Sequence, residues 1–483
     1  MITIDFSKRG SEGLCDFLSS SLRAQISGGI LRADEKLPSK RALASHLGVS
    51  VITVQNAYEQ LIDEGYIYSI EKKGFFVTDI AFNKHDDFAP DGAPEDYAPP
   101  ASQNALKNLK SALARAKTDY FVDFRNNATN VERFPFSQWA HVMRSVLKSG
   151  DEKLLQRQGV NGVFELRQAI SRHLVEFRNL NVLPEQILIG AGTESLYSML
   201  VQFFGRDKTY AVENPGYHKV AKIFELNGAS VIPVKIDEQG ITPKNLIQNK
   251  IDVVHLSPSH HFPTGKVMPI RRRLELLQWA NDASDRFIIE DDYDSEFRFN
   301  GKPLPTLFSS DHNGRVVYVN TFSKTISPSF RISYMVLPAA IALDFQKKLG
   351  LYSCSVSAFE QYTLAQFIND GFYANHLIRM KNYYRNLRNS LIYALENSSF
   401  KGLIQISEEE AGLHFLLSFN TAKTQELKAA FSDQSLNLPL LSEFYYDAET
   451  ETSTFVINYS ALQKEKIPEL VKRMEKALSN IKV

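Results

Sequence analysis

Several segments of this chain place polar, chemically useful side chains directly after runs of apolar residues that predict buried strands. The segment QILIGAGTESLYSML predicts a strand, a glycine turn and a helix, whose free N-terminal amides could hold a phosphate group. Loops at the carboxyl ends of parallel strands are where α/β folds bind their ligands. In this chain those loops present Gly192, Thr193, Tyr217, Ser259, His260, Asp291, Asp292, Tyr293, Ser323, Lys324 and Arg331.

These residue types match pyridoxal 5′-phosphate, which carries an aldehyde, a basic ring nitrogen, a phenolic oxygen, a flat ring and a dianionic phosphate. Lys324 would form a Schiff base with the aldehyde, which requires an amine pKa below its ordinary value. A buried Asp291 would keep the ring nitrogen protonated, so that the ring withdraws electrons. The remaining contacts are expected from Tyr293 to the ring oxygen, from Tyr217 to the ring face, and from Ser323, Arg331, Gly192 and Thr193 to the phosphate.

Some of these assignments leave alternatives open. Either Asp291 or Asp292 could face the ring nitrogen, and we expect Asp291 there. His260 could contact the cofactor oxygen or could only form hydrogen bonds within its loop. For His261 we favour the loop role.

Length and composition indicate what class of protein carries these residues. The 483 residues exceed one ordinary domain, and 43% hydrophobic with 23% charged residues is typical of globular proteins. Lys+Arg 55 balance Asp+Glu 55, so any contact with nucleic acid needs a local cluster of charge. Cys15 and Cys354 are too few for a disulfide framework, and no metal site is expected. Without a signal segment or a long apolar run, we expect a cytoplasmic protein that does not cross a membrane.

Three regions differ along the chain. Residues 1–78 are dense in helix and hairpin signals, and residues 79–118, rich in proline, aspartate and alanine, predict an extended linker. From residue 119 to residue 483, apolar strands alternate with amphipathic helices, which is typical of an α/β domain with a mostly parallel sheet.

The first region predicts a winged helix-turn-helix, an α+β fold. Apolar residues at helical spacing from Leu14 to Ile26 indicate one helix, ended by Gly28 and Gly29. Two shorter helices follow, capped by Ser39 and Ser50 and joined by a turn at Gly48, and the second should bury Val54, Ala57, Leu61 and Ile62. Tyr66–Ile70 and Phe75–Val77 predict a hairpin with Gly74 at its tip.

The charge of this region tests a role in DNA binding. Residues 1–80 hold nine basic and ten acidic residues, a net charge of −1, which argues against strong electrostatic binding. The distribution is more favourable, because the stretch from Lys36 to Tyr58 contains Lys36, Lys40 and Arg41 but no acidic residue, and the hairpin adds Lys72 and Lys73. We expect this face to contact phosphates, although a winged helix used for protein contacts is the alternative.

The run GGILRADEKLPSKRALASHLGVSVITVQNAYEQLIDEGYIYSIEKKGFFV resembles the DNA-binding head of GntR-type bacterial regulators. That family often has arginine directly after GVS and again two residues after the threonine, where this chain has Val51 and Gln55, so the operator sequence cannot be transferred. Together, the resemblance, the cap and the local charges assign DNA binding to Ser39, Lys40, Arg41, Ser50, Thr53, Gln55, Asn56, Lys72, Lys73 and Gly74.

Residues 119–483 resemble fold-type I, aspartate aminotransferase-like enzymes that depend on pyridoxal phosphate. The segments ENPGYHKV, SPSHHFPTG, IEDDYDSEFR and TFSKTISPSFRISYMVLP are specifically similar to MocR-type regulators, which fuse a GntR head to such a body. The resemblance implies that Lys324 is the cofactor lysine and Asp291 the partner of the ring nitrogen. It also implies a homodimer with each head on its partner's body.

Two functions compete at this stage. The first is a transcriptional regulator that binds an operator in double-stranded DNA and whose body senses a small amine, an amino acid or a vitamin B6 vitamer. The second is an active aminotransferase with an accessory winged helix; we favour the regulator. The resemblance places Lys219 and Val456 where the 4-aminobutyrate-responsive member has arginines, so that site is not reproduced. Lys219 remains a candidate for binding the effector, and vitamin B6 is a plausible one.

Overall fold

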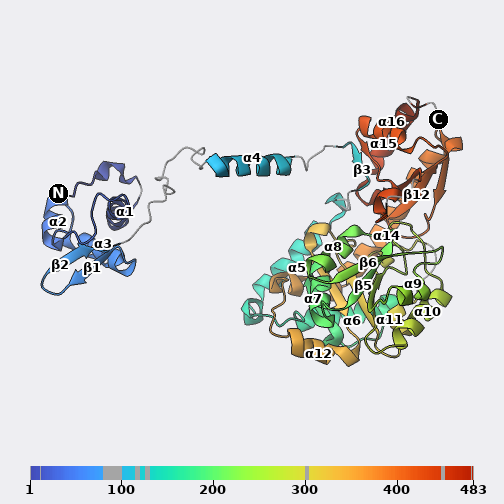
Figure 1. Ribbon diagram of the computed structural model, residues 1–483, viewed down its shortest axis with the longest axis horizontal. Coiled ribbons are helices and arrows are strands. Elements are labelled where there is room, and N and C mark those ends of the chain that lie inside the picture. The colour runs from blue at the N-terminus through green and yellow to red at the C-terminus, as the bar shows by residue number, and fades with distance from the viewer. Residues whose placement is uncertain are drawn as a thin grey trace. The chain divides into compact units, whose positions relative to one another are not determined.

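The chain forms two compact units, Met1–Lys117 and Thr118–Val483 (Figure 1). The computed structural model describes residues 2–10, 12–79, 100–114, 120–125, 131–299, 304–447, 452–479 and 481. Within these ranges, no helix combines the length and the apolar composition that a membrane crossing requires.

The first unit begins with a winged helix-turn-helix, as its sequence predicts. Ser39 and Ser50 each accept a hydrogen bond from the backbone N–H three residues later, so both predicted helix caps are present. Between the two capped helices, Gly48 adopts φ of 68°, the left-handed conformation that glycine tolerates best. The elements are α1 (Leu14–Ser27), α2 (Lys40–Leu47), α3 (Val51–Asp63) and the antiparallel pair β1 (Ile67–Ile70) and β2 (Gly74–Val77).

The core of this unit differs from the predicted one in two details. Tyr58 is fully buried on α3 and donates a hydrogen bond to the carbonyl of Pro38, whereas Ile62 is only partly buried. Gly74 is the first residue of β2, paired with Ile70, so the prediction that it forms the hairpin tip was wrong. The core consists of Ile2, Leu18, Leu22, Ile26, Leu31, Leu37, Leu43, Ala44, Val54, Ala57, Tyr58, Leu61, Ile67 and Val77.

The expected linker contains a helix, α4 (Pro100–Ala114), and this corrects the prediction of an extended segment. Proline is tolerated at the first position of a helix, and the alanine, leucine and lysine residues that follow it favour helix formation. Residues 104–111 are all exposed. Residues 80–99 and 115–119 lie outside the described residues, so the boundaries 79 and 118 remain a prediction.

The second unit is built on a seven-stranded sheet with the order β4-β10-β9-β8-β7-β5-β6. Only β10 runs antiparallel to its neighbours; the other pairings are parallel, which is the mostly parallel sheet that the sequence predicts. Its strands are β4 (Ile187–Ala191), β5 (Thr209–Asn214), β6 (Ser230–Lys235), β7 (Val253–Leu256), β8 (Phe287–Asp291), β9 (Val316–Thr321) and β10 (Ile332–Val336).

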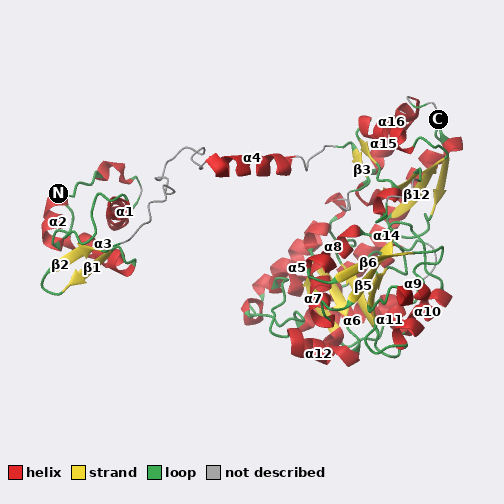
Figure 2. Ribbon diagram, viewed as in Figure 1, coloured by secondary structure: helices red, strands yellow, loops and turns green. Residues whose placement is uncertain are grey.

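Helices pack on both faces of this sheet (Figure 2). The side chains of consecutive strand residues point to opposite faces. Ile289 packs with residues of α7 and α8, whereas its neighbour Ile288 packs with residues of α10. This alternation means that neighbouring residues at a strand end also point in different directions. The helices are α5 (Phe136–Lys148), α6 (Phe164–Arg178), α7 (Thr193–Phe204), α8 (His218–Leu226), α9 (Pro243–Gln248), α10 (Ile270–Asn281), α11 (Leu307–Ser310), α12 (Ala339–Leu349) and α13 (Ala358–Asn369).

A smaller C-terminal lobe follows the long helix α14 (Phe372–Glu396), and its elements α15 and α16 are orange to red in Figure 1. Its antiparallel sheet has the order β11-β12-β14, and a short parallel pair joins β13 to β3. A core with many aromatic side chains, separate from the core of the large sheet, holds this lobe together. The elements are β3 (Val122–Asp123), β11 (Ile404–Ser407), β12 (His414–Phe419), α15 (Thr424–Asp433), β13 (Leu436–Asn437), β14 (Thr454–Asn458) and α16 (Ile467–Ser479).

Candidate functional site

A cavity of about 220 Å³ opens at the carboxyl ends of the parallel strands. Strands β5, β8 and β9 end at its wall, and helix α7 begins there directly after β4. The loops that the sequence singles out therefore converge in space, at the edge of the sheet where open α/β folds bind their ligands. Of the residues predicted for this site, Thr193, Tyr217, Lys219, Asp291, Tyr293, Ser323, Lys324 and Arg331 line the cavity.

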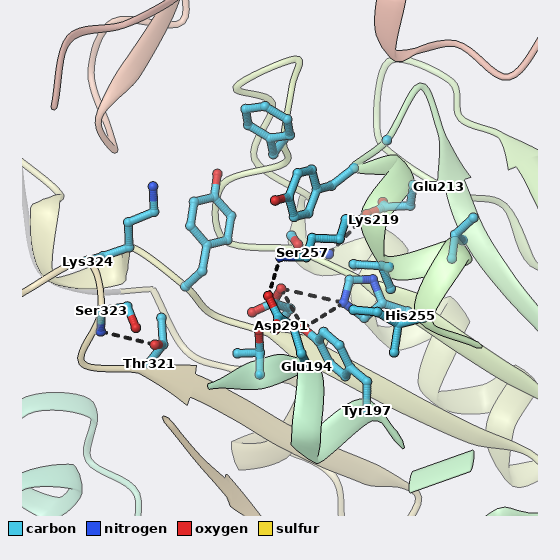
Figure 3. Close-up of a pocket in the computed structure, with 18 of the residues that line it drawn as sticks. Glu194, Tyr197, Glu213, Lys219, His255, Ser257, Asp291, Thr321, Ser323 and Lys324 are labelled. Atoms are coloured by element: carbon cyan, nitrogen blue, oxygen red, sulfur yellow. Dashed lines mark hydrogen bonds and ion pairs between the residues drawn. The ribbon is translucent and has the colours of Figure 1, made fainter. Parts of the chain in front are cut away.

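Lys324 lies in the turn that follows β9, on one side of the cavity (Figure 3). Burial lowers the pKa of its amine to about 8, although the nearby carboxylates of Asp294 and Asp291 oppose this effect. A larger fraction of the amine is thus neutral at physiological pH than for an exposed lysine. Only the neutral amine can attack a carbonyl carbon, so the environment prepares Lys324 for nucleophilic chemistry.

Asp291 ends β8 and lies in the middle of the cavity wall (Figure 3). Its Oδ2 accepts a hydrogen bond from the hydroxyl of Tyr197 at 2.9 Å, and His255 Nε2 lies 3.5 Å from the same oxygen. Its Oδ1 is buried and has no hydrogen-bond partner among the described residues. A buried carboxylate with one oxygen held and the other unpartnered is suited to a cationic N–H donor in the cavity.

Asp292 takes the opposite direction, as expected for the next residue along an extended chain. Its Oδ2 lies 2.5 Å from Arg178 Nη2 and accepts a hydrogen bond from the Tyr318 hydroxyl at 2.8 Å. Both members of the ion pair are almost fully buried, with exposed side-chain fractions of 2% and 1%. Asp292 does not line the cavity, so of the two aspartates only Asp291 is available to a ligand there.

The two histidines are placed differently from the sequence expectation. His260 does not line the cavity: its Nδ1 lies 2.9 Å from Asp294 Oδ2 and 3.2 Å from the hydroxyl of Tyr293, behind the cavity wall. His261, for which we favoured a purely local role, does line the cavity and also pairs with Thr264 in its own loop at 2.7 Å. The carboxylate of Asp294 and the ring of His260 thus support Tyr293 from behind.

The start of α7 contributes another part of the cavity wall. Gly192 caps this helix with φ of 82°, and a Cβ atom built on it would lie only 2.2 Å from Arg331 Nη2. Glycine is therefore required for the guanidinium to lie against the helix N-terminus. The hydroxyl oxygen of Ser323 is buried in the same cavity and has no partner within the described ranges. Backbone amides, a guanidinium and an unpartnered hydroxyl together form a cradle for an anion such as a phosphate.

The position where the sequence comparison expects a carboxylate-binding arginine is apolar. Val456 is buried in β14 and packs with Leu416 and Leu441. Phe262, which lines the cavity, contacts this apolar cluster and packs edge-on against the ring of Tyr217. At this position the protein therefore provides apolar contacts in place of a guanidinium.

The residues assigned to DNA lie on the surface of the winged helix. Arg41, Gln55 and Asn56 are exposed, as are Ser39, Ser50, Lys72 and Lys73, while Thr53, Lys40 and Gly74 are partly exposed. Three of them already form side-chain hydrogen bonds: Gln55 donates to Glu59 at 2.8 Å, and the hydroxyls of Ser50 and Thr53 share a hydrogen bond. The recognition helix α3 carries no lysine or arginine, so its contacts to bases would come from amides and apolar groups.

Tyr197, His255 and Glu194 are among the cavity residues that the sequence reasoning missed. His255 carried a signal, since it is a polar residue in the middle of the buried strand VVHL. Tyr197 and Glu194 belong to α7 and follow its capping glycine by five and two residues. Tyr197 contacts Asp291, and Glu194 contacts Lys219 and Arg331. These partners come from other segments of the chain, so the periodicity of α7 cannot reveal them.

Known families match both units. Residues 15–77 match the family of bacterial regulatory proteins, gntR family, and residues 124–474 match aminotransferase class I and II. An uncharacterized HTH-type transcriptional regulator of Bacillus subtilis, YdeL, is 35% identical over 93% of both chains. The probable rhizopine catabolism regulatory protein MocR of Rhizobium meliloti is 30% identical over 95% of this chain and 92% of its own. The pyridoxine biosynthesis transcriptional regulator PdxR of Corynebacterium glutamicum is 30% identical over 89% and 88%.

Solved structures support the fold of the second unit. An archaeal alanine:glyoxylate aminotransferase superposes with a TM-score of 0.67 at 22% identity, covering 79% of this chain and 96% of its own. A kynurenine aminotransferase of Pyrococcus horikoshii, solved with PMP, gives 0.66 at 22% identity and covers 83% and 99%. The second unit therefore has the fold-type I aminotransferase fold, whose family depends on pyridoxal phosphate.

The regulators and the enzymes match different extents of the chain. The regulators align along nearly its whole length, across both the head and the body, whereas the enzyme structures cover about four fifths of it. The chain belongs to the MocR-type transcriptional regulators, in which a GntR-family DNA-binding head is fused to an aminotransferase class I and II domain.

Proposed function

We propose that the body of this regulator binds pyridoxal 5′-phosphate at Lys324 and that occupancy of this site changes how the heads bind an operator in double-stranded DNA. One observation carries the proposal: among the buried polar atoms of residues that line the cavity of Lys324, Asp291 Oδ1 and Ser323 Oγ have no hydrogen-bond partner in the described part of the chain. Buried polar atoms without a partner are uncommon, and a ligand with complementary groups would satisfy both.

The cofactor would supply an aldehyde that couples to a lysine amine and a ring that withdraws electrons. Asp291, held by Tyr197 and His255, would accept a hydrogen bond from the protonated ring nitrogen and so keep it protonated. Tyr293 would donate to the ring oxygen, with His260 supporting its hydroxyl from behind in place of the direct contact that we considered from the sequence. The phosphate contacts would come from Gly192, Thr193, Ser323 and Arg331, and Tyr217 would stack on the ring.

The effector is proposed to be a vitamin B6 vitamer, including the cofactor itself. The buried Val456 and its apolar neighbours argue against recognition of an α-carboxylate by a guanidinium at that wall. The name of the relative PdxR links it to pyridoxine biosynthesis, and this supports the same class of ligand here. Lys219, which also lines the cavity and is paired with Glu194, would supply a cation for an anionic effector.

We further propose that the protein acts in the cytoplasm as a homodimer in which each head packs on its partner's body. A single head with a net charge near −1 would bind DNA weakly, and two linked heads raise the effective concentration at a second half-site. Sedimentation velocity would test this assembly: a mass of one chain, 54.7 kDa, at micromolar concentration would contradict it.

The test of the function measures DNA affinity as a function of the cofactor. Protein freed of cofactor would be titrated on the DNA upstream of its own gene, by fluorescence anisotropy, with and without pyridoxal phosphate. We expect the cofactor to change the affinity for wild type and for Lys222→Ala, an exposed lysine outside the cavity, but not for Lys324→Ala. Equal DNA affinity in both conditions for wild type, together with sustained turnover of an amino acid and a keto acid, would favour the aminotransferase alternative.

A further inference from the structure

Glu194 places a negative charge inside the proposed phosphate end of the cavity. It is the second residue of α7, and its carboxylate lies between two cations, Lys219 and Arg331. Its Oε1 accepts a hydrogen bond from Lys219 on α8, and its Oε2 lies 3.0 Å from Arg331 Nη2. The arginine expected to hold a phosphate is therefore already paired with a carboxylate of the protein itself.

The carboxylate is ionised at neutral pH. The hydrogen bond from Lys219 is the largest cause that lowers the pKa of Glu194, and the charge of Arg331 acts in the same direction. Glutamine has nearly the same shape, so Glu194→Gln would remove one negative charge with little change in volume.

The charges at this end of the cavity do not balance once a phosphate is present. Lys219 and Arg331 supply two positive charges, and a phosphate monoester carries nearly two negative charges at neutral pH. With Glu194 present the group has an excess of about one negative charge, and like charges a few ångströms apart repel each other even when partly solvated. A phosphate that binds here must therefore either share the two cations with the Glu194 carboxylate or displace that carboxylate from them.

We propose that Glu194 competes with the cofactor phosphate for Arg331 and Lys219, and that it thereby makes cofactor binding weaker and more readily reversible. This inference rests on the proposed function, because it concerns the same cavity. A sensor must release its ligand when the free concentration falls, whereas an enzyme gains from holding its cofactor. An internal competing anion produces that behaviour without changing the residues that contact the ring.

The competition is tested by equilibrium titration of cofactor-free protein with two probes. Pyridoxal 5′-phosphate carries the phosphate, and pyridoxal lacks it, so the difference between the two isolates the phosphate end. Binding is followed by visible absorption and by quenching of protein fluorescence, neither of which requires catalysis. The variants are Glu194→Gln and Glu194→Ala, and the matched control is Glu225→Gln, which removes a carboxylate paired with Lys222 on α8 outside the cavity.

We expect both Glu194 variants to bind pyridoxal phosphate about tenfold more tightly than wild type, which corresponds to about 1.4 kcal/mol. Their affinity for pyridoxal should be unchanged, and Glu225→Gln should behave as wild type with both probes. Wild type should also lose the phosphorylated cofactor faster on dialysis than Glu194→Gln does.

Three outcomes would overturn the inference. Equal or weaker binding of pyridoxal phosphate by both Glu194 variants would show that the carboxylate does not compete. An equal gain for Glu225→Gln would assign the effect to general charge. In both of these cases cofactor binding, and with it the proposed function, would stand; failure of wild type and all variants to bind either probe would reject the proposed function as well.

Discussion

The head and the body of this chain present their functional residues in opposite ways. In the head, the residues assigned to DNA are exposed on a small apolar core and come from one stretch of fewer than 40 residues. In the body, the cavity residues are contributed by segments spread from Thr193 to Arg331, and several are buried and held by one another. We therefore expect substitutions of exposed side chains in the head to change stability little, whereas substitutions of buried residues at the cavity should change both ligand binding and stability.

Two ion pairs provide the sharpest contrast between the regions. Arg178 and Asp292 in the body are almost fully buried, while Arg23 and Glu64 in the head are about one third exposed. We expect Asp292→Ala to lower the free energy of unfolding of the body by about 3–5 kcal/mol, because it leaves the buried guanidinium without its partner. Arg23→Ala should cost the head less than about 1 kcal/mol, since water replaces an exposed partner.

Denaturant unfolding followed separately by signals of each region would measure both effects. A loss of similar size in the two regions would mean that burial does not distinguish these pairs and would remove the basis of the comparison.

The pH dependence of cofactor binding belongs to the body alone. Burial lowers the pKa of Lys324 to about 8, and only its neutral amine reacts, so the rate of covalent attachment should fall about tenfold for each pH unit below 8. The unfolded chain has a lysine pKa near 10.4, so between pH 8 and 10 the unfolded state binds more protons and this residue's contribution to stability rises with pH. Stopped-flow absorption between pH 6 and 9 gives the profile; a rate that is constant over this range would contradict the lowered pKa.

Arg41→Ala tests the head in isolation from the cavity. Arg41 is exposed at the start of α2, so its loss should weaken binding to the operator by about tenfold and leave the visible absorption of the bound cofactor unchanged. Mobility-shift and absorption titrations on the same preparation provide the two readings. Loss of both activities would mean that the two units do not act as separate binding regions.

Ser50→Ala is expected to have a small effect on the stability of the head. It removes the side-chain cap of α3, and the loss of such a cap costs about 1 kcal/mol. The thermal transition of the head should move down by a few degrees, and that of the body should stay in place. Calorimetry would resolve the two transitions, and an equal shift of the body would show that the units unfold together.

The sequence predicts the head well because its signals are local. Ser39 and Ser50 cap helices that begin at the next residue, and the glycines fix the turns through their own conformations. The failure at α4 has the same origin: the prolines before it suggested an extended linker, but from Pro100 onward the residues favour a helix.

The cavity is only partly predictable, since its arrangement depends on tertiary contacts. The strand ends identify Lys324 and Asp291 as candidates, but the sequence cannot say which of two adjacent aspartates faces the cavity. That choice follows from Arg178, 114 positions away, which takes Asp292 into the core. The role of Glu194 could not be predicted for the same reason, because it depends on ion pairs with Lys219 and Arg331, which come from other segments.

The most direct test of the account is to locate the cofactor chemically. Protein incubated with pyridoxal 5′-phosphate would be reduced with borohydride, digested, and analysed by mass spectrometry for the added pyridoxyl phosphate. We predict that the modification maps to the peptide containing Lys324 in stoichiometric amount, and that Lys324→Ala shows none in its place. Modification spread over exposed lysines, with Lys324 unmodified, would contradict the central claim.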